Sequence, residues 1–297
     1  MASNTVDFGP LFQLSTIGVD PAGLSFNTVT MESEKYVCVR EKNAQGTVQL
    51  VIVDMSKPNE PMRRPIAADS AIMNPVVPII ALKSGTNLQI FDLTQRKMLK
   101  SVQITENVVF WTWISKKTVG IVTETAVYHW SLGDTSDPAK VFDRHNSLAN
   151  TQIINYKADC KEQWLALIAI SASEGGKVAG HIQLYSVSRK VSQPLEGHAA
   201  TFATIQMGGH ETSLFVFASK PIAGTPPKMH VIEVGTERKP EHAPRYEKKA
   251  IDLQFTPEQA SDFPIALNAS SKYAVVYMLT KMGFLYVFDL AVGFLLY

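Results

Sequence analysis

The histidines are the side chains here with the widest chemical range, because imidazole binds metals and transfers protons near neutral pH. There are seven of them: His129, His145, His181, His198, His210, His230 and His242. None has the helical spacing, or the neighbouring cysteines or carboxylates, that a metal site needs. His129 and His230 lie in predicted strands, where a hydrogen-bonded structural role is expected. We therefore predict no metal site.

Catalytic motifs are also missing. The sequence has no G-x-S-x-G nucleophile elbow, and Gly175-Gly176-Lys177 lacks the first glycine and the following Ser or Thr of a phosphate loop. Carboxylates such as Glu32, Asp69 and Asp143 are scattered, and sequence alone cannot bring two of them to the separation that a glycosidase uses. We expect no enzyme, no catalytic residue and no cofactor.

The residues 89–91 carry a better binding signal. In a strand, Gln89 and Phe91 lie on one face and Ile90 on the other. An amide beside an aromatic ring suits a peptide, since the amide pairs with the peptide backbone and the ring gives an apolar wall. Arg64, Arg96 and Lys97 would add positive charge nearby. The alternative is that Phe91 is core and the bases form a solvated rim.

These residues belong to a pattern that recurs six times. Each copy pairs an apolar run with an alternating strand that ends in a small or acidic residue. The first members are 36–39, 79–82, 119–122, 164–167, 214–217 and 274–277, and the second members are 51–54, 89–92, 128–131, 183–186, 230–233 and 286–289. Residues 171–180 and 219–228 are expected to be long hairpin loops, and 236–249 a crossing between repeats.

The second strands end roughly 38 to 56 positions apart, about 47 on average, which is typical of propeller blades. Helical periodicity is absent. We predict an all-β chain with a single β-propeller domain over 1–297. Because an apolar edge at 294–297 would be left bare, we expect a larger ring that is incomplete at the C-terminus, with Leu295, Leu296 and Tyr297 near an exposed edge and a strand around 8–14 across the gap. A six-bladed ring is the alternative.

Composition narrows the class of protein. The chain has 297 residues, 45% of them hydrophobic and 19% charged, with a net charge of +1, which disfavours a nucleic-acid ligand. No apolar stretch of about 18 residues or signal peptide is present. Cys38 and Cys160 lie far apart and are expected to be ordinary buried thiols. These features predict a cytoplasmic protein without membrane insertion.

Several strings are too specific for a general blade consensus. They are 30–36 (TMESEKY), 62–75 (MRRPIAADSAIMNP), 88–91 (LQIF), 110–114 (FWTWI), 142–156 (FDRHNSLANTQIINY) and 190–202 (KVSQPLEGHAATF). From about residue 14 to its end, the chain resembles the N-terminal domain of the clathrin heavy chain. The resemblance implies a seven-bladed β-propeller, of which about six blades are present, and which recruits adaptors through short linear motifs.

The resemblance also implies binding sites. The clathrin-box groove, between the first two blades, matches Arg64, Ile80, Gln89 and Phe91. Of the family's basic pair, one position is Arg96 and the other is Met98, with Lys97 between them. The groove is therefore expected to persist with weaker or differently delivered charge.

The resemblance implies a second and a third binding site, whereas the family's fourth site has no clear match in this sequence. The W-box pocket matches Phe26, Gln152 and Ile154, and a groove between the fourth and fifth blades matches Trp164, Leu184, Arg189, Gln193 and Leu195. The proposed site near the N-terminus has no clear match, because an acidic family position is Pro10 here. Strand packing remains the alternative role for Trp164 and Ile154, and a staple on the first blade for Phe26.

The implied function is adaptor and cargo-motif binding in the clathrin coat during vesicle formation and endocytosis, on the cytoplasmic face of coated pits and vesicles. Implied partners are trafficking adaptors and the rest of the heavy chain, which trimerises and binds light chains outside this region. A generic propeller scaffold that binds folded partners is the alternative. A peptide array separates the two, because only a motif receptor selects short Leu-rich acidic peptides.

Overall fold

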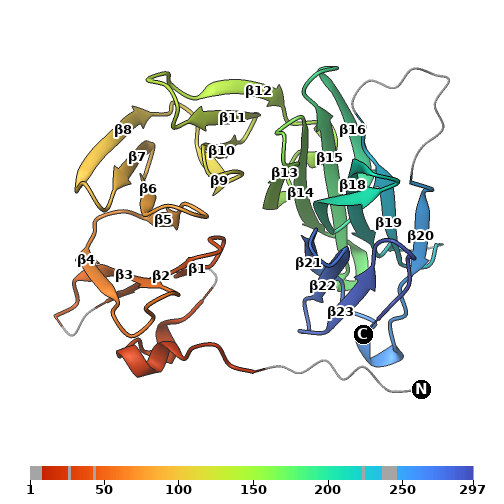
Figure 1. Ribbon diagram of the computed structural model, residues 1–297, viewed down its shortest axis with the longest axis horizontal. Coiled ribbons are helices and arrows are strands. Elements are labelled where there is room, and N and C mark those ends of the chain that lie inside the picture. Colours follow the sequence, from red (N-terminus) through yellow and green to blue (C-terminus); the bar gives the residue numbers. More distant parts are fainter. Residues whose placement is uncertain (1–8, 26–27, 43–44, 223–224, 236–245, 297) are drawn as a thin grey trace. The chain divides into compact units, whose positions relative to one another are not determined.

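The fold consists of antiparallel sheets in chain order (Figure 1). The computed structural model describes residues 9–25, 28–42, 45–222, 225–235 and 246–296. Within these residues five sheets have four strands and one has three, and each sheet is a meander of consecutive strands. We call the sheets blades 1 to 6. This architecture is that of a β-propeller, and the prediction of an all-β chain is confirmed.

The first unit, residues 1–140, holds blades 1 and 2 and most of blade 3. Its strands are β1 (Val29–Thr30), β2 (Tyr36–Lys42), β3 (Val48–Asp54) and β4 (Met62–Pro65) in blade 1; β5 (Ser70–Met73), β6 (Ile79–Ser84), β7 (Asn87–Asp92) and β8 (Lys97–Gln103) in blade 2; and β9 (Val108–Trp113), β10 (Thr118–Thr123), β11 (Ala126–Ser131) and β12 (Ala139–Asp143) in blade 3.

The second unit, residues 141–297, begins within β12 and holds blades 4 to 6. Its strands are β13 (Gln152–Ala158), β14 (Trp164–Ala172), β15 (Val178–Ser186) and β16 (Val191–Glu196) in blade 4; β17 (Ala199–Met207), β18 (His210–Ser219), β19 (Lys228–Glu233) and β20 (Lys249–Asp252) in blade 5; and β21 (Pro264–Ser270), β22 (Val275–Thr280) and β23 (Leu285–Asp289) in blade 6.

The helical content of the described chain is limited to five 3₁₀ turns. They are η1 (Leu14–Ile17), η2 (Pro21–Gly23), η3 (Asn146–Leu148), η4 (Glu174–Gly176) and η5 (Pro257–Gln259). The prediction of a strand around 8–14 is wrong for residues 9–13, where the structure has no strand. Leu11, in this segment, is 93% exposed. No helix among the described residues has both the length and the apolar character needed to span a membrane.

All twelve strand segments expected from the sequence are strands, except that the segment 274–277 begins one residue later, at Val275. The turns between them follow local chemistry. Two-residue hairpin turns need glycine where φ is positive. Gly208 and Gly209, at φ 56° and 77°, occupy both positions of the β17–β18 turn. The expected loop at 171–180 is shorter than predicted, because β14 continues to Ala172 and β15 starts at Val178. Backbone pairing extends this hairpin beyond the apolar residues that mark it in the sequence.

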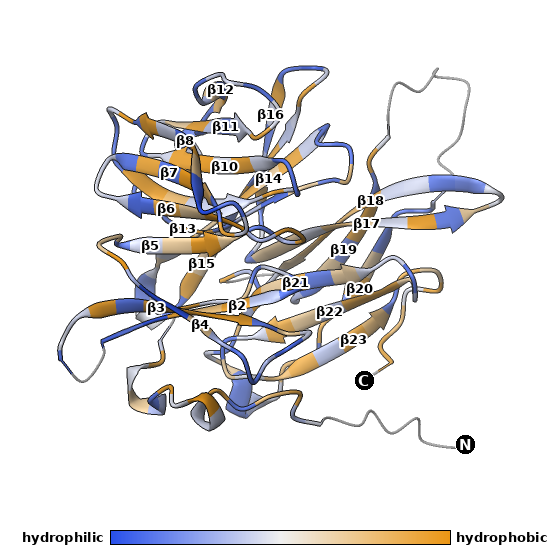
Figure 2. Cartoon of the chain, turned by 60° about the vertical axis from the view of Figure 1, so that its left-hand side comes forward, coloured by the Kyte–Doolittle hydropathy of each residue, from blue (hydrophilic) through white to orange (hydrophobic). Residues whose placement is uncertain are grey.

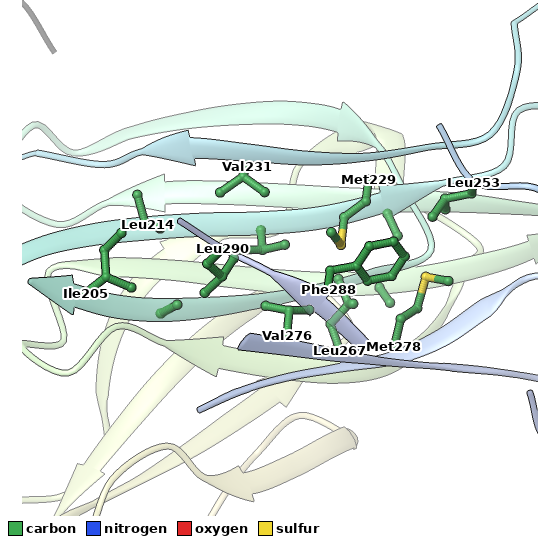
Figure 3. Packing of buried hydrophobic residues seen from close by; sticks show 14 of the residues in the cluster. Ile205, Leu214, Met229, Val231, Leu253, Leu267, Val276, Met278, Phe288 and Leu290 are labelled. Carbon is green, nitrogen blue, oxygen red and sulfur yellow. The ribbon is translucent and has the colours of Figure 1, made fainter. Parts of the chain in front are cut away.

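Apolar residues cluster where one blade packs on the next within each unit. Hydrophobic and hydrophilic colours alternate along the strands (Figure 2). Between blades 5 and 6, Phe288 of β23 is 1% exposed, and it packs with Met229 of β19 and Met278 of β22 (Figure 3). Such a seam removes apolar area from water at about 25 cal/mol per Å². Face-to-face packing therefore gives each blade the cover that a single repeat cannot supply.

Candidate functional site

Strand β7 sends its side chains to two different seams, as its alternation predicts. Ile90 is fully buried in the cluster between blades 2 and 3, with Ile121 and Trp130. Phe91 is half-buried and packs on the cluster between blades 1 and 2. Gln89 is half-buried on the same face as Phe91, and within the described chain its side-chain amide makes no hydrogen bond. An apolar ring and an amide with open bonding positions therefore share one surface.

Ile80 is the floor beneath these residues. It pairs with Phe91 across β6 and β7, so the two side chains share a face, and it is 2% exposed. It belongs to the same cluster as Tyr36, Leu50 and Ile52 of blade 1. Ile80 thus contributes packing under the surface, whereas Phe91 above it is partly accessible to solvent.

Blade 1 supplies the other wall through β4. Arg64 pairs with Leu50 and Met62 with Ile52, and both partners are buried in the cluster that faces blade 2. Arg64 and Met62 are exposed on that face. Arg63, one position along, points the other way, because its guanidinium donates to the carbonyl oxygen of Ile17 at 2.5 Å. Met62 was not among the site residues predicted from the sequence, although it lies two positions from the predicted Arg64 and therefore on the same face of β4.

Strand β8 borders the same surface. Its register with β7 puts the side chains of Lys97 and Met98 on opposite faces of the blade. A bulge lies between Ile90 and Phe91, where Phe91 pairs with Met98 and Ile90 with Lys100. Lys97 pairs with Asp92, so its side chain lies on the face opposite to Phe91. Lys97 is exposed, but it does not belong to the wall that Phe91 forms.

Arg96 lies in the turn that joins β7 to β8. It is exposed and adopts a positive φ of 54°, which a turn residue tolerates at some cost. The turn is fixed by Asp92, whose carboxylate accepts hydrogen bonds from the backbone N–H groups of Thr94 and Gln95. Arg96 therefore stands at the end of the strand pair that carries Phe91.

A small cavity lies between blades 1 and 2. Its volume is about 20 Å³, and Cys38, Leu50 and Ala71 are among the residues that line it. Such a volume holds about one water molecule. Burial raises the pKa of the Cys38 thiol to about 12, so this thiol stays protonated. The cavity is too small for a ligand, and a peptide would have to lie on the outer surface.

A second apolar surface lies between blades 4 and 5. Leu184 is 3% exposed at its floor, and Trp164 and Leu195 are half-buried against the same cluster. Gln193 pairs directly with Leu184 and is exposed on the outer strand β16. Arg189 is exposed in the turn before this strand. The structure thus brings four of the five predicted residues to one face of blade 4, with Arg189 at its end.

Blade 5 contributes a wall to this surface that was not predicted from the sequence. Phe202, Phe217 and Ile232 are half-buried against the cluster that holds Leu184. His230 pairs with Phe217 and stacks on its ring, with centroids 4.7 Å apart and planes 18° apart. Burial lowers the pKa of His230, and Lys248 and Lys228 lower it further. Alternation puts His230 and Ile232 on one face of β19, and the pairing of His230 with Phe217 joins this face to that of β18.

The predicted W-box residues are only partly placed. Phe26 lies outside the described residues. Gln152 is exposed at the start of β13, and Ile154 is the extra residue of a bulge between Ile153 and Asn155. Ile154 packs on the same cluster as Trp164. Pro10, at the position of the unmatched fourth site, is exposed and outside any strand.

The thiols and metal-binding side chains add no second kind of site. Cys38 is buried, but the prediction that Cys160 is buried is wrong, since it is exposed with its Sγ 3.7 Å from the Thr204 hydroxyl. It follows a strand end, where hydrophobicity does not determine burial. No group of three or more His, Cys, Asp or Glu that could hold a metal occurs among the residues that the structure describes.

Comparison with known proteins identifies relatives along the whole chain. Residues 148–188 match the family model described as clathrin propeller repeat. The chain is 48% identical over 290 residues to clathrin heavy chain 2 of Homo sapiens, and 47% identical over 294 residues to the clathrin heavy chain of Drosophila melanogaster. These alignments cover 97% and 98% of the chain but 17% of each relative. The chain thus spans about a sixth of their length.

A solved structure is similar in fold. The structure of Kluyveromyces lactis Hsv2p aligns with a TM-score of 0.50 over 89% of this chain and 75% of that chain, at 11% identity. At this identity the likeness concerns the fold alone.

Proposed function

Because the chain belongs to the clathrin heavy chain family in the region that it shares with these relatives, we propose that it is the adaptor-binding propeller of a clathrin coat. In this role it binds short linear peptides in surface grooves between blades, at the cytoplasmic face of coated membranes. One observation carries the proposal: Phe91 and Gln89 share a half-buried face above the seam of blades 1 and 2.

The chemistry of this groove fits an extended peptide. The Gln89 amide can donate to and accept from a peptide backbone, and Phe91 offers an apolar wall for a leucine-sized side chain. Arg64 and Arg96 can pair with a ligand carboxylate. The surface over Trp164 and Leu195 likewise combines an apolar floor, a glutamine amide and an exposed arginine, and we propose it as a second peptide groove.

Each groove is expected to bind weakly. A peptide of about six residues buries little surface and loses its own conformational freedom. Several grooves on one propeller, and several propellers in one lattice, would raise the overall affinity by increasing the effective concentration of motifs. This arrangement suits a coat that must assemble and disassemble.

The test is binding of a labelled hexapeptide of alternating leucine and aspartate, measured by fluorescence anisotropy. The double variant Gln89→Ala/Phe91→Ala should lose at least about tenfold in affinity, because it removes the central contact of the groove. The matched control is Gln206→Ala/Phe284→Ala, which removes the same two side-chain types from exposed positions in blades 5 and 6. Thermal unfolding of both variants checks that the fold persists.

If both double variants bind like the unmodified chain, the groove assignment is wrong. If the chain instead captures only folded partners and no peptide, the scaffold alternative replaces the proposal.

A further inference from the structure

We infer that Met98 makes the groove between blades 1 and 2 select an apolar ligand residue, rather than an acidic one, where the ligand passes β8. The inference rests on the proposed function and specifies the class of peptide that the groove takes. It depends on which face of β8 each side chain occupies.

The register of β8 places Met98 on the groove face. Met98 pairs with Phe91, and Phe91 pairs with Ile80, so the three side chains form a row across blade 2. Their exposure rises along this row: Ile80 is 2% exposed, Phe91 is half-buried and Met98 is 47% exposed. The apolar floor of the groove therefore continues outward to the edge strand.

The lysines on either side of Met98 face the other seam. Lys100 pairs with Ile90, and its Nζ donates to the carbonyl oxygens of Ser131 and Ser136 in blade 3 at 2.8 and 2.7 Å. Lys97 pairs with Asp92, on that same face. The positive charge of β8 is thus directed toward blade 3, and the side chain that β8 presents to the groove is uncharged.

Blade 1 has a matching apolar side chain on the opposite wall. Met62 of β4 is 37% exposed and pairs with Ile52, which is buried in the cluster between blades 1 and 2. Methionine adapts its unbranched side chain to different apolar partners. Two exposed methionines, on the outer strands of adjacent blades, thus border the groove above Phe91.

The two arginines of the groove lie away from Met98. Arg64 lies two positions from Met62 on β4, and Arg96 lies in the turn between β7 and β8. A carboxylate beside either arginine gains a partner, whereas a carboxylate over Met98 loses water without gaining one. The ligand class is therefore an extended peptide with acidic residues near the arginines and an apolar residue over β8.

A substitution scan with defined peptides tests this selection. The probes are the alternating leucine–aspartate hexapeptide and three relatives in which one aspartate at a time is replaced by leucine. With the unmodified chain, one of the three replacements should raise affinity by about three- to tenfold, as expected for a partly buried leucine side chain. The other two should lower it or leave it unchanged.

The matched variant exchanges two neighbours, Lys97→Met/Met98→Lys, and so keeps the net charge and the composition. It moves the cation onto the groove face, and the favoured replacement should now bind at least about threefold more weakly than the alternating peptide. Met98→Gln, which adds no charge, should abolish the preference without reversing it. Thermal unfolding confirms that both variants fold.

The outcomes separate the inference from the proposed function. If the alternating peptide binds best and the exchange variant keeps the same order of probes, the inference about Met98 is overturned while the groove stands. If Gln89→Ala/Phe91→Ala has no effect on any probe, the proposed function fails and the inference falls with it.

Discussion

His198 shows how one buried side chain can be fixed in a single protonation state. It is fully buried; its Nε2–H donates to the carbonyl oxygen of Val178 at 3.0 Å, and its Nδ1 accepts from the backbone N–H of Lys220 at 3.3 Å. A proton on Nδ1 would remove the second bond. Burial lowers the pKa of His198, although the bond to Val178 and the charge of Glu196 oppose the shift. His181 and Lys220 lower it further.

A pH dependence of stability follows from this shift. Above about pH 6.5 His198 is neutral in both states, but below that value the unfolded chain binds a proton that the folded chain resists. Stability should therefore fall as the pH drops from 7 to 5, by at most about 1.4 kcal/mol per pH unit for one group. Urea unfolding at both pH values measures it.

The variant His198→Gln should show a smaller loss between pH 7 and 5 than the unmodified chain. His230→Gln is the comparison variant. The pKa of His230 is lowered too, but because its ring is only half-buried, this variant should change the pH dependence of stability less than His198→Gln does. An equal pH dependence of the unmodified chain and His198→Gln would contradict the role of His198.

Lys220 is a second residue whose role is structural. Its Nζ donates to the carbonyl oxygens of Gln259, Ala260 and Asp262 at 2.9, 2.9 and 2.6 Å, and lies 4.3 Å from the ring centroid of Phe255. Desolvation lowers the pKa of Lys220, and Asp262 opposes this. One ammonium group thus satisfies three carbonyls in the segment that leads into blade 6.

We expect Lys220→Met to destabilise the fold by about 2–3 kcal/mol, because three charge-assisted hydrogen bonds are lost at once and their carbonyls lose a partner. Lys272→Met is the control, since Lys272 is exposed, and it should change the free energy of unfolding by less than about 0.5 kcal/mol. Chemical denaturation gives both values. Similar losses in the two variants would show that the carbonyls are satisfied by water.

At the scale of elements, the hairpin β14–β15 meets the start of β17 at a crossing of two glycines. Gly180 and Gly197 are both buried, and the backbone N–H of Gly197 donates to the carbonyl oxygen of Gly180 at 3.1 Å. A Cβ built on Gly180 would lie 2.4 Å from the carbonyl oxygen of Gly197. Glycine is required here for close approach of two backbones, which brings blade 5 onto blade 4.

Gly180→Ala should therefore lower the free energy of unfolding by about 1–3 kcal/mol or more, because backbone must move to admit the methyl group. It should also weaken peptide binding at the blade 4/5 groove. Gly23→Ala, where a Cβ meets nothing within 4 Å, is the control. The prediction is checked by thermal unfolding, and a Gly180→Ala variant as stable as the control would contradict it.

At the scale of the whole molecule, charge is nearly balanced, with 28 basic and 27 acidic residues besides the histidines. Long-range attraction of an acidic peptide should then be small, and the local arginines should dominate. We expect affinity for the alternating leucine–aspartate peptide to fall by less than about tenfold between low and physiological ionic strength. A steeper dependence would indicate cations beyond Arg64 and Arg96 in the site.

Charge reversal at Arg96 tests the same point. Arg96→Glu should weaken the leucine–aspartate peptide more than a leucine–asparagine peptide, because only the first has a carboxylate to repel. Arg189→Glu makes the same change of net charge in blade 4, and it should affect a peptide bound at the first groove less. If Arg96→Glu lowers the affinity for both peptides equally, Arg96 makes no electrostatic contribution to binding.

The sequence by itself determined one pair of strands in each blade and the two faces of β7. Alternation is a local property of the extended backbone, so Gln89, Ile90 and Phe91 could be divided between two faces before any sheet was known. The β6–β7 turn at Gly85-Thr86 is likewise local, because glycine itself accepts the positive φ of 56° found there. These are the reasons why the six strand pairs and the two-sided character of β7 were predictable.

Only the tertiary structure decided what each face meets. The bulge in β8 shifts the register by one residue, and this places Met98 beside Phe91 and turns Lys97 away. Register depends on pairing with another strand, so no count along β8 alone could supply it. The aromatic wall of blade 5 and the exposure of Cys160 were missed for the same reason: burial is a property of neighbours from distant segments, and the chain's local pattern does not contain them.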